Sequence, residues 1–411
     1  MTLNRILKFS WRYFRAKKSA QAINIISWVS VVAIAFGTAA LITILSAFNG
    51  FESLVKSLYA SFYPAIKISP AQGKVITISP EQWRRINSLQ GIEAISKTVE
   101  GKALIQQGPL QAVVQLKGVD DQYASVAGVS ASMYRGVFST GTEDKPGLVL
   151  GVGIEQALGI VSDRTVFPVS VYLPQKKVQQ FADPTQALSM SLAYPQGSFA
   201  IQSEFDNNYV LTNLDFVKTY MGFGESEYSA LELKTKIGVE ETLLLKQLQN
   251  LLGPAYKIED RYQQNSTLYA TIRLEKLAIY GIFSLILLVA AFNMIGSLSM
   301  LVLEKRQDIQ VLKSMGAEDN LIRKVFLAEG ILLAGIGTAA GLMMAMLVYF
   351  LQTRFKLVPL EGSTFLIDYY PMEIVATDIL LVLATVFAIG VMASWMPSVR
   401  ASKQTISLRS S

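Results

Sequence analysis

Four long runs of uncharged, mostly apolar residues constrain this chain more than any other feature. The first run lies between Lys18 and Glu52, and the others are Leu277–Leu303, Gly330–Thr353 and Ile379–Val399. A helix needs about 20 apolar residues to cross the hydrocarbon of a bilayer, and every run is long enough. The apolar region of a cleaved signal peptide is shorter, so we interpret the first run as a retained anchor.

The composition agrees with a membrane protein. Only 17% of the residues are charged and 51% are hydrophobic, whereas a soluble domain has about 25% charged residues. The chain has no Cys and no His, which excludes disulfides, thiolate or imidazole metal sites and a Ser-His-Asp triad. We therefore expect no catalytic residues, no metal site and no cofactor in this chain, which is not itself an enzyme.

The distribution of Lys and Arg predicts the orientation. The net charge is +6, and the basic residues gather beside the apolar runs, in 1–18, 304–324 and 400–411. Basic flanks are retained in the cytoplasm, so both termini and the loop 304–324 are predicted to be cytoplasmic. Because topology explains the basic charge, no nucleic acid partner is expected.

The predicted fold is a membrane protein with four transmembrane α-helices and a large extracytoplasmic, periplasmic α+β domain inserted between helices 1 and 2. The expected division is a cytoplasmic N-terminal segment 1–18, helix 1 at 19–51, the α+β domain at 52–271, helix 2 at 272–303, a cytoplasmic coupling loop or helix at 304–324, helix 3 at 325–353, an external loop at 354–378, helix 4 at 379–399 and a cytoplasmic tail at 400–411.

Alternating patterns within 52–271 predict both strands and helices. Strands are expected at 65–69, 74–79 and 111–119, a strand running into a helix at 147–160, a helix after Pro80 and another that ends at Gly253. Residues 172–198 contain three prolines and predict a long surface excursion. The stretch 199–214 alternates as strand, polar turn and strand, which predicts a protruding hairpin.

Several strings resemble a known family. They are SWVSVVAIAFGTAALITILSAFNGFE (27–52), AAFNMIGSLSMLVLEK (290–305), EKRQDIQVLKSMGA (304–317) and WMPSVRA (395–401), with partial matches at VVQLKGVD and GLVLGVGIEQALGI. The chain resembles the permeases of the lipoprotein-releasing system, the LolC and LolE type, within the FtsX/MacB-like permease group. The resemblance implies a permease subunit of a mechanotransmitting ABC transporter in the cell inner membrane, which extracts lipoproteins from the outer leaflet and passes them to a periplasmic carrier. A MacB-like export permease and an FtsX-like regulator that activates a cell-wall hydrolase stay open as alternatives.

The resemblance also implies partners. These are two copies of a cytoplasmic ABC ATPase, a second permease that is homologous or identical, the lipoprotein substrate, a periplasmic lipoprotein carrier and membrane lipid. ATP and Mg would be bound by the ATPase, which agrees with the lack of a GxxxxGK[ST] phosphate loop in this sequence.

Three sets of site residues follow from the resemblance. The ATPase-coupling residues are Glu304, Lys305, Arg306, Asp308, Ile309, Leu312, Met315 and Gly316, the last as a helix stop. The candidate substrate cavity is lined by Trp28, Val32, Phe36 and Ile44. The candidate carrier-binding hairpin has Ser203, Glu204, Phe205, Asp206, Asn207 and Asn208 at its tip. Small residues along the first and third runs are predicted to pack helices together instead of lining a transport path.

Overall fold

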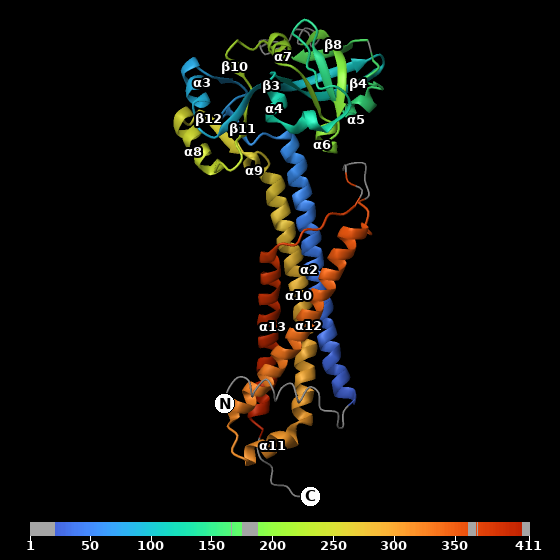
Figure 1. Ribbon diagram of the computed structural model, residues 1–411, viewed down its shortest axis with the longest axis vertical. Coiled ribbons are helices and arrows are strands. Elements are labelled where there is room, and N and C mark those ends of the chain that lie inside the picture. Colours follow the sequence, from blue (N-terminus) through green and yellow to red (C-terminus); the bar gives the residue numbers. More distant parts are fainter. Residues whose placement is uncertain (1–20, 166, 175–187, 361–366, 368, 405–411) are drawn as a thin grey trace. The chain divides into compact units, whose positions relative to one another are not determined.

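The computed structural model describes residues 21–165, 167–174, 188–360, 367 and 369–404 (Figure 1). Four predicted segments lie wholly or partly outside the described residues. They are the basic segment 1–18, part of the excursion 172–198, part of the loop 354–378 and most of the tail 400–411. The chain divides into two compact units. The helical bundle contains Met1–Ser53, Thr271–Pro359 and Tyr369–Ser411, and the α+β domain contains Leu54–Ala270 and Leu360–Asp368.

Four long helices confirm the predicted spans. Each is long and apolar enough to cross a membrane, and they are α2 (Gln21–Phe62), α10 (Ser266–Glu304), α12 (Asp319–Phe355) and α13 (Ala376–Ser402). Both α2 and α10 exceed the predicted spans, since α2 continues beyond residue 51 and α10 begins before residue 272. The cause is local: residues 52–62 contain no Gly or Pro, and Pro64 follows the end of α2. Both helices therefore contain residues of both units.

The bundle packs through small residues, as predicted. A Cβ atom at Gly37 would lie 2.8 Å from Leu287 of α10, and one at Gly341 would lie 2.5 Å from the carbonyl oxygen of Ala35. The hydroxyls of Ser30 and Ser297 share a buried hydrogen bond of 2.7 Å between α2 and α10. Without a hydrophobic driving force between helices in lipid, such close approach supplies the van der Waals contact that holds them together.

The α+β domain contains a ten-stranded sheet in the order β12-β1-β11-β3-β4-β9-β6-β8-β5, with β7 joining β3 to β8. The strands of its larger part are β3 (Ile92–Gln107), β4 (Leu110–Val119), β5 (Met133–Gly136), β6 (Gly147–Gly151), β7 (Val169–Pro174), β8 (Leu188–Phe199) and β9 (Tyr209–Asn213). The pairing of six of them closes into a ring, β3-β4-β9-β6-β8-β7-β3. Its apolar core also takes in residues of α5 (Val152–Ala157) and α7 (Leu214–Met221).

A second core lies among the remaining strands and two helices. They are β1 (Ile66–Pro70), β2 (Ile76–Thr77), β10 (Glu227–Tyr228), β11 (Ala230–Thr235), β12 (Tyr256–Asp260), α3 (Pro80–Asn87) and α8 (Glu241–Leu252). Local signals explain both helices. Ser79 and Gln82 form a capping box before α3, and Gly253 ends α8 with φ 79°.

The predicted hairpin at 199–214 is wrong. Strands β8 and β9 do not pair with each other, because β6 lies between them in the sheet. The predicted tip is the short helix α6 (Ser203–Asp206), in which Phe205 and Asp206 are buried. The alternating apolar and polar residues do form two strands, β8 and β9. Both pair with β6, which comes much earlier in the chain, and not with each other.

The predicted excursion at 172–198 is also wrong where the structure describes it. Residues Leu188–Phe199 form β8, which pairs antiparallel with β7 from Val169↔Ala193 to Pro174↔Leu188. The prolines that suggested a loop occupy tolerant positions. Pro174 is the last residue of its strand, and Pro195 lies beside a register shift in the pairing with β6.

A buried group of charges joins the strands of the α+β domain. Lys117 of β4 lies 2.7 Å from Glu232 of β11 and 3.5 Å from Glu100 of β3, and Glu100 also lies 3.6 Å from Lys67 of β1. Burial alone would lower the pKa of Lys117, but the two carboxylates raise it well above its usual range. The two positive and two negative charges therefore balance each other inside the domain.

We expect Lys117→Met to destabilise the α+β domain by about 3 to 5 kcal/mol, because it leaves Glu232 charged, buried and unpaired. The double variant Lys117→Met with Glu232→Leu should recover much of this loss, since the remaining Glu100 keeps Lys67 as its partner. Chemical denaturation of the full-length protein in detergent measures both. Equal stability of Lys117→Met and wild type would contradict a structural role for the charge group.

Candidate functional site

The predicted coupling segment forms a short helix of its own. Helix α10 ends at Glu304, Lys305 breaks the helix, and α11 covers Arg306–Ser314 (Figure 1). Gly316 follows with φ 89°, and its N–H donates to the carbonyl oxygen of Lys313 at 3.0 Å. The predicted helix stop at Gly316 is confirmed, because only glycine adopts this backbone conformation without strain.

The two faces of α11 differ in what they offer a partner. Ile309 is only 2% exposed and packs into the core of the bundle, so it anchors α11 to this chain and is not available to a partner. Val311 and Met315 are 57% and 79% exposed, one helical turn apart. Asp308 is also exposed and lies on the same side as Val311 and Met315 by the period of the helix, which gives this outward face both apolar and charged groups, whereas Arg306 is exposed on another side.

Lys313 holds α11 in place, a role that the sequence did not reveal. Its Nζ donates to the carbonyl oxygens of Ser402 at 2.6 Å and Gln404 at 2.8 Å, and it lies 2.7 Å from the carboxylate of Asp319. A single side chain thus connects α11 to the end of α13 and the start of α12. Its partners are distant in sequence or follow a loop, so no local sequence pattern predicts these contacts.

The predicted cavity residues of α2 share an open face. Trp28, Val32 and Phe36 are 51%, 46% and 60% exposed and recur every four residues, which places them on one side of the helix. Ile44 is half-buried. Within the described residues, these three side chains keep about half of their surface exposed, so in a bilayer this face would meet lipid or another subunit.

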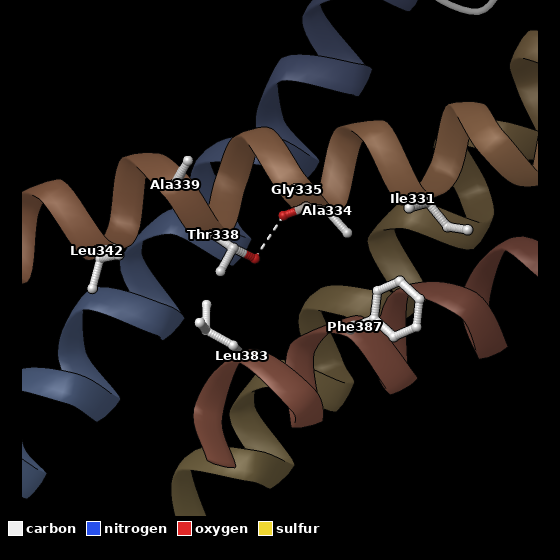
Figure 2. Close-up of a pocket in the computed structure, with 8 residues that line it drawn as sticks. All are labelled: Ile331, Ala334, Gly335, Thr338, Ala339, Leu342, Leu383 and Phe387. Atoms are coloured by element: carbon white, nitrogen blue, oxygen red, sulfur yellow. Dashed lines mark hydrogen bonds between the residues drawn. The ribbon is translucent and has the colours of Figure 1, made fainter. Parts of the chain in front are cut away.

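A cavity of about 430 Å³ lies elsewhere in the bundle, between α12 and α13 (Figure 2). Its lining is almost wholly apolar and consists of Ile331, Ala334, Gly335, Thr338, Ala339, Leu342, Leu383 and Phe387. The one hydroxyl, from Thr338, donates within its own helix to the carbonyl oxygen of Ala334 at 2.7 Å. None of the predicted cavity residues of α2 lines this space.

Residues 203–208 receive the end of α2 within the α+β domain, and their predicted binding of a carrier stays a prediction. The ring of Phe62 stacks on the ring of Phe205 with centroids 4.4 Å apart. The centroid of the Tyr209 ring lies 4.6 Å from that of Phe62. The hydroxyl of Tyr59 donates to the carboxylate of Glu204. The exposed members of the segment are Glu204, Asn207 and Asn208.

The end of α2 is also tied to the start of α10. After α2, the carbonyl oxygens of Tyr63 and Pro64 accept hydrogen bonds from Arg261 and Gln264, each at 3.3 Å, in the short helix α9 (Arg261–Gln264). These bonds occupy carbonyl groups that follow the helix, where no helical partner exists. The residues after α2 are thus hydrogen-bonded to the short helix that directly precedes α10.

No group of three or more Asp and Glu residues within the described parts of the chain is arranged to hold a metal ion. Three features of the described residues remain available for contacts: the outward face of α11, the face of α2 that carries Trp28, Val32 and Phe36, and the contact between the end of α2 and α6.

Comparison with known proteins gives two family matches. A profile described as FtsX-like permease C-terminal matches residues 280–406, and one described as MacB-like periplasmic core domain matches residues 27–169. The first covers α11, α12 and α13 with most of α10. The second covers most of α2 and the first part of the α+β domain.

Similar proteins extend over nearly the whole chain. The lipoprotein-releasing system transmembrane protein LolE of Haemophilus influenzae is 28% identical, with 98% of each chain covered. The LolC protein of Neisseria meningitidis is 26% identical, with 95% of each covered. The crystal structure of the periplasmic region of MacB from Actinobacillus actinomycetemcomitans matches 53% of this chain and 98% of its own at 14% identity, with a TM-score of 0.37.

Asp206 of α6 should make stability depend on pH. Burial raises its pKa to about 6 from 3.8, against the effect of the backbone N–H of Ile201, which donates to its carboxylate at 2.9 Å. Between these two values the folded state holds a proton that the unfolded state has lost, so stability falls as pH rises through the window. We expect wild type to lose up to about 3 kcal/mol relative to Asp206→Asn between about pH 4 and pH 7. Thermal unfolding of both full-length proteins across this range measures the difference, and parallel curves would refute it.

Proposed function

We propose that this chain, a homologue of the lipoprotein-releasing permeases with an FtsX-like C-terminal region and a MacB-like periplasmic core domain, is the membrane subunit of an ATP-driven lipoprotein transporter. The single observation that carries the proposal is similarity over nearly the full length of both chains, spans and α+β domain together. Four membrane-spanning helices and a periplasmic-type domain make it an inner-membrane protein.

ATP would be hydrolysed by a separate subunit. The sequence holds no GxxxxGK[ST] loop, so ATP and Mg would be bound by two copies of a cytoplasmic ATPase. The outward face of α11 supports docking, because Val311 and Met315 are exposed apolar side chains and the exposed charge of Asp308 lies on the same side of the helix. In this orientation both termini are cytoplasmic and the α+β domain is periplasmic, as the basic flanks predict.

The substrate would leave the membrane beside α2. A lipid-anchored protein presents acyl chains, and the open face of Trp28, Val32 and Phe36 is apolar along several turns. A second permease, identical or homologous, would close this face into a cavity. Since α2 and α10 contain residues of both units, ATP-driven displacement of these helices would move the α+β domain and pass the lipoprotein to a periplasmic carrier.

The direct test uses the complex purified from native membranes and returned to proteoliposomes that hold a lipoprotein. We expect ATP to release the lipoprotein to a soluble carrier, and a non-hydrolysable analogue to release none. ATP hydrolysis without release would refute the substrate. Copurification of a cell-wall hydrolase in place of a carrier would favour the regulator alternative, and export of a peptide would favour a MacB-like exporter.

The docking face of α11 yields a mutational prediction. Val311→Asp with Met315→Asp should reduce copurification of the ATPase and ATPase activity of the membranes by about tenfold or more, since buried apolar anchors contribute about 1 to 2 kcal/mol each. Both side chains are exposed, so the fold of this chain should be unaffected. Ile237→Asp is the matched control, because Ile237 is a fully exposed apolar residue of the α+β domain. Equal ATPase recovery in all three proteins would exclude α11 as the docking site.

A further inference from the structure

Three polar side chains from three different spans meet within the bundle. The Asn49 amide of α2 donates to the carboxylate of Asp378 of α13 at 2.7 Å. Lys276 of α10 donates to the amide oxygen of Asn49 at 2.8 Å and lies 2.9 Å from the same oxygen of Asp378. Each pair of groups is thus in direct contact, and the three form a closed triangle.

The triangle lies at the ends of three of the uncharged runs. Lys276 directly precedes the second run and Asp378 directly precedes the fourth, while Asn49 is close to the end of the first. Asn49 is 5% exposed, and the side chains of Lys276 and Asp378 are 31% and 19% exposed. An ion pair with a charge-assisted amide bridge is stronger at such a site than on an open surface, because water competes less for the groups.

A neighbouring loop packs against the same turn of α2. The N–H of Glu373 donates to the carbonyl oxygen of Ser46 at 2.8 Å. A Cβ atom at Gly50 would overlap the carbonyl of Pro371 and lie 2.7 Å from the Cα of Met372. Only glycine at position 50 lets this loop pass, so Asn49 and Gly50 together join α2 to the segment that leads into α13.

We propose that Asn49, Lys276 and Asp378 form a clasp that makes the ends of α2, α10 and α13 move as one body during transport. The proposal rests on the proposed function for its link to transport, but not for its mechanical content. The clasp residues are positioning residues. Their side chains contact one another, and they set how displacement of one helix is shared with the other two.

The hydrogen-bonding groups of Asn49 explain why the clasp requires one cation and one anion. The amide of Asn49 donates and accepts at the same time, which matches one cation and one anion. Substitution of Lys276 leaves Asp378 without its ion-pair partner beside the membrane. Exchange of the two charges returns one cation and one anion to these positions, and rotation of the Asn49 amide lets it donate to the new anion and accept from the new cation.

The first experiment compares Lys276→Met, Asn49→Ala and the exchange Lys276→Asp with Asp378→Lys, each in the complete transporter. We expect Lys276→Met to reduce lipoprotein release by about tenfold while ATPase activity stays within about twofold, and the exchange to recover most of the release. The matched control is Lys234→Met, which breaks a 2.8 Å ion pair with Glu93 in the α+β domain. Release by the control should equal that of wild type.

The second readout needs no substrate. The chain has no Cys, so spin labels at Leu277→Cys and Leu380→Cys, both about two-thirds exposed, report on α10 and α13 beside the clasp. In a transporter whose partner subunits lack Cys, we expect one narrow distance distribution that is the same without nucleotide and with trapped ATP. Lys276→Met should broaden it and make it depend on nucleotide, and the charge exchange should narrow it again.

The outcomes separate the two proposals. Wild-type release and an unchanged label distribution in both Lys276→Met and Asn49→Ala would overturn the clasp. Loss of assembly that the charge exchange does not rescue would also overturn it, because the residues would then serve folding alone. Failure of the wild-type complex to release lipoprotein, with label distributions that still respond to Lys276→Met, would refute the substrate and leave the clasp standing.

Discussion

The hydrocarbon of the bilayer is the constraint from which the rest of this structure follows. Inside it, backbone groups must pair within each helix and an unpaired charge is costly, so the uncharged runs of α2, α10, α12 and α13 fill the interior. Ionised side chains are therefore found near the ends of these uncharged runs. Lys313 at one set of ends and Lys276 at the other are both found there, each connecting three elements. The bilayer therefore restricts contacts between ionised side chains of different helices to the ends of those helices.

The parts of the fold that depend on short-range pattern were predictable from the sequence. Uncharged length identified the four spans, and Pro80 and Gly253 marked helix ends of the α+β domain. The hairpin at 199–214 failed because β6, far earlier in the chain, pairs with both β8 and β9. The excursion at 172–198 failed because proline was taken as a loop signal, although a strand end and a register shift both accept it.

The sequence predicted features of the candidate site only where they depend on the residue itself and not on contacts with distant parts of the chain. Gly316 ends α11 as predicted, and Met315 is exposed, while its docking to a partner stays a prediction. Ile309 has the same character in sequence but turns into the bundle core, because periodicity alone does not tell which side of a short helix is covered. The clasp escaped prediction altogether, since its hydrogen bonds connect residues 227 and 329 positions apart.

Packing and polar contacts have different tasks in this bundle. Small residues such as Gly37 and Gly341 allow close contact, yet smooth apolar surfaces do little to fix the register of one helix against another. Polar contacts between membrane helices contribute only about 1 kcal/mol each, so their value lies in direction more than in strength. Asn49 shows the consequence. Aspartate there would repel Asp378, and alanine would leave both charges without the amide, so a side chain that donates and accepts at once is the one that sets three helices in a single register.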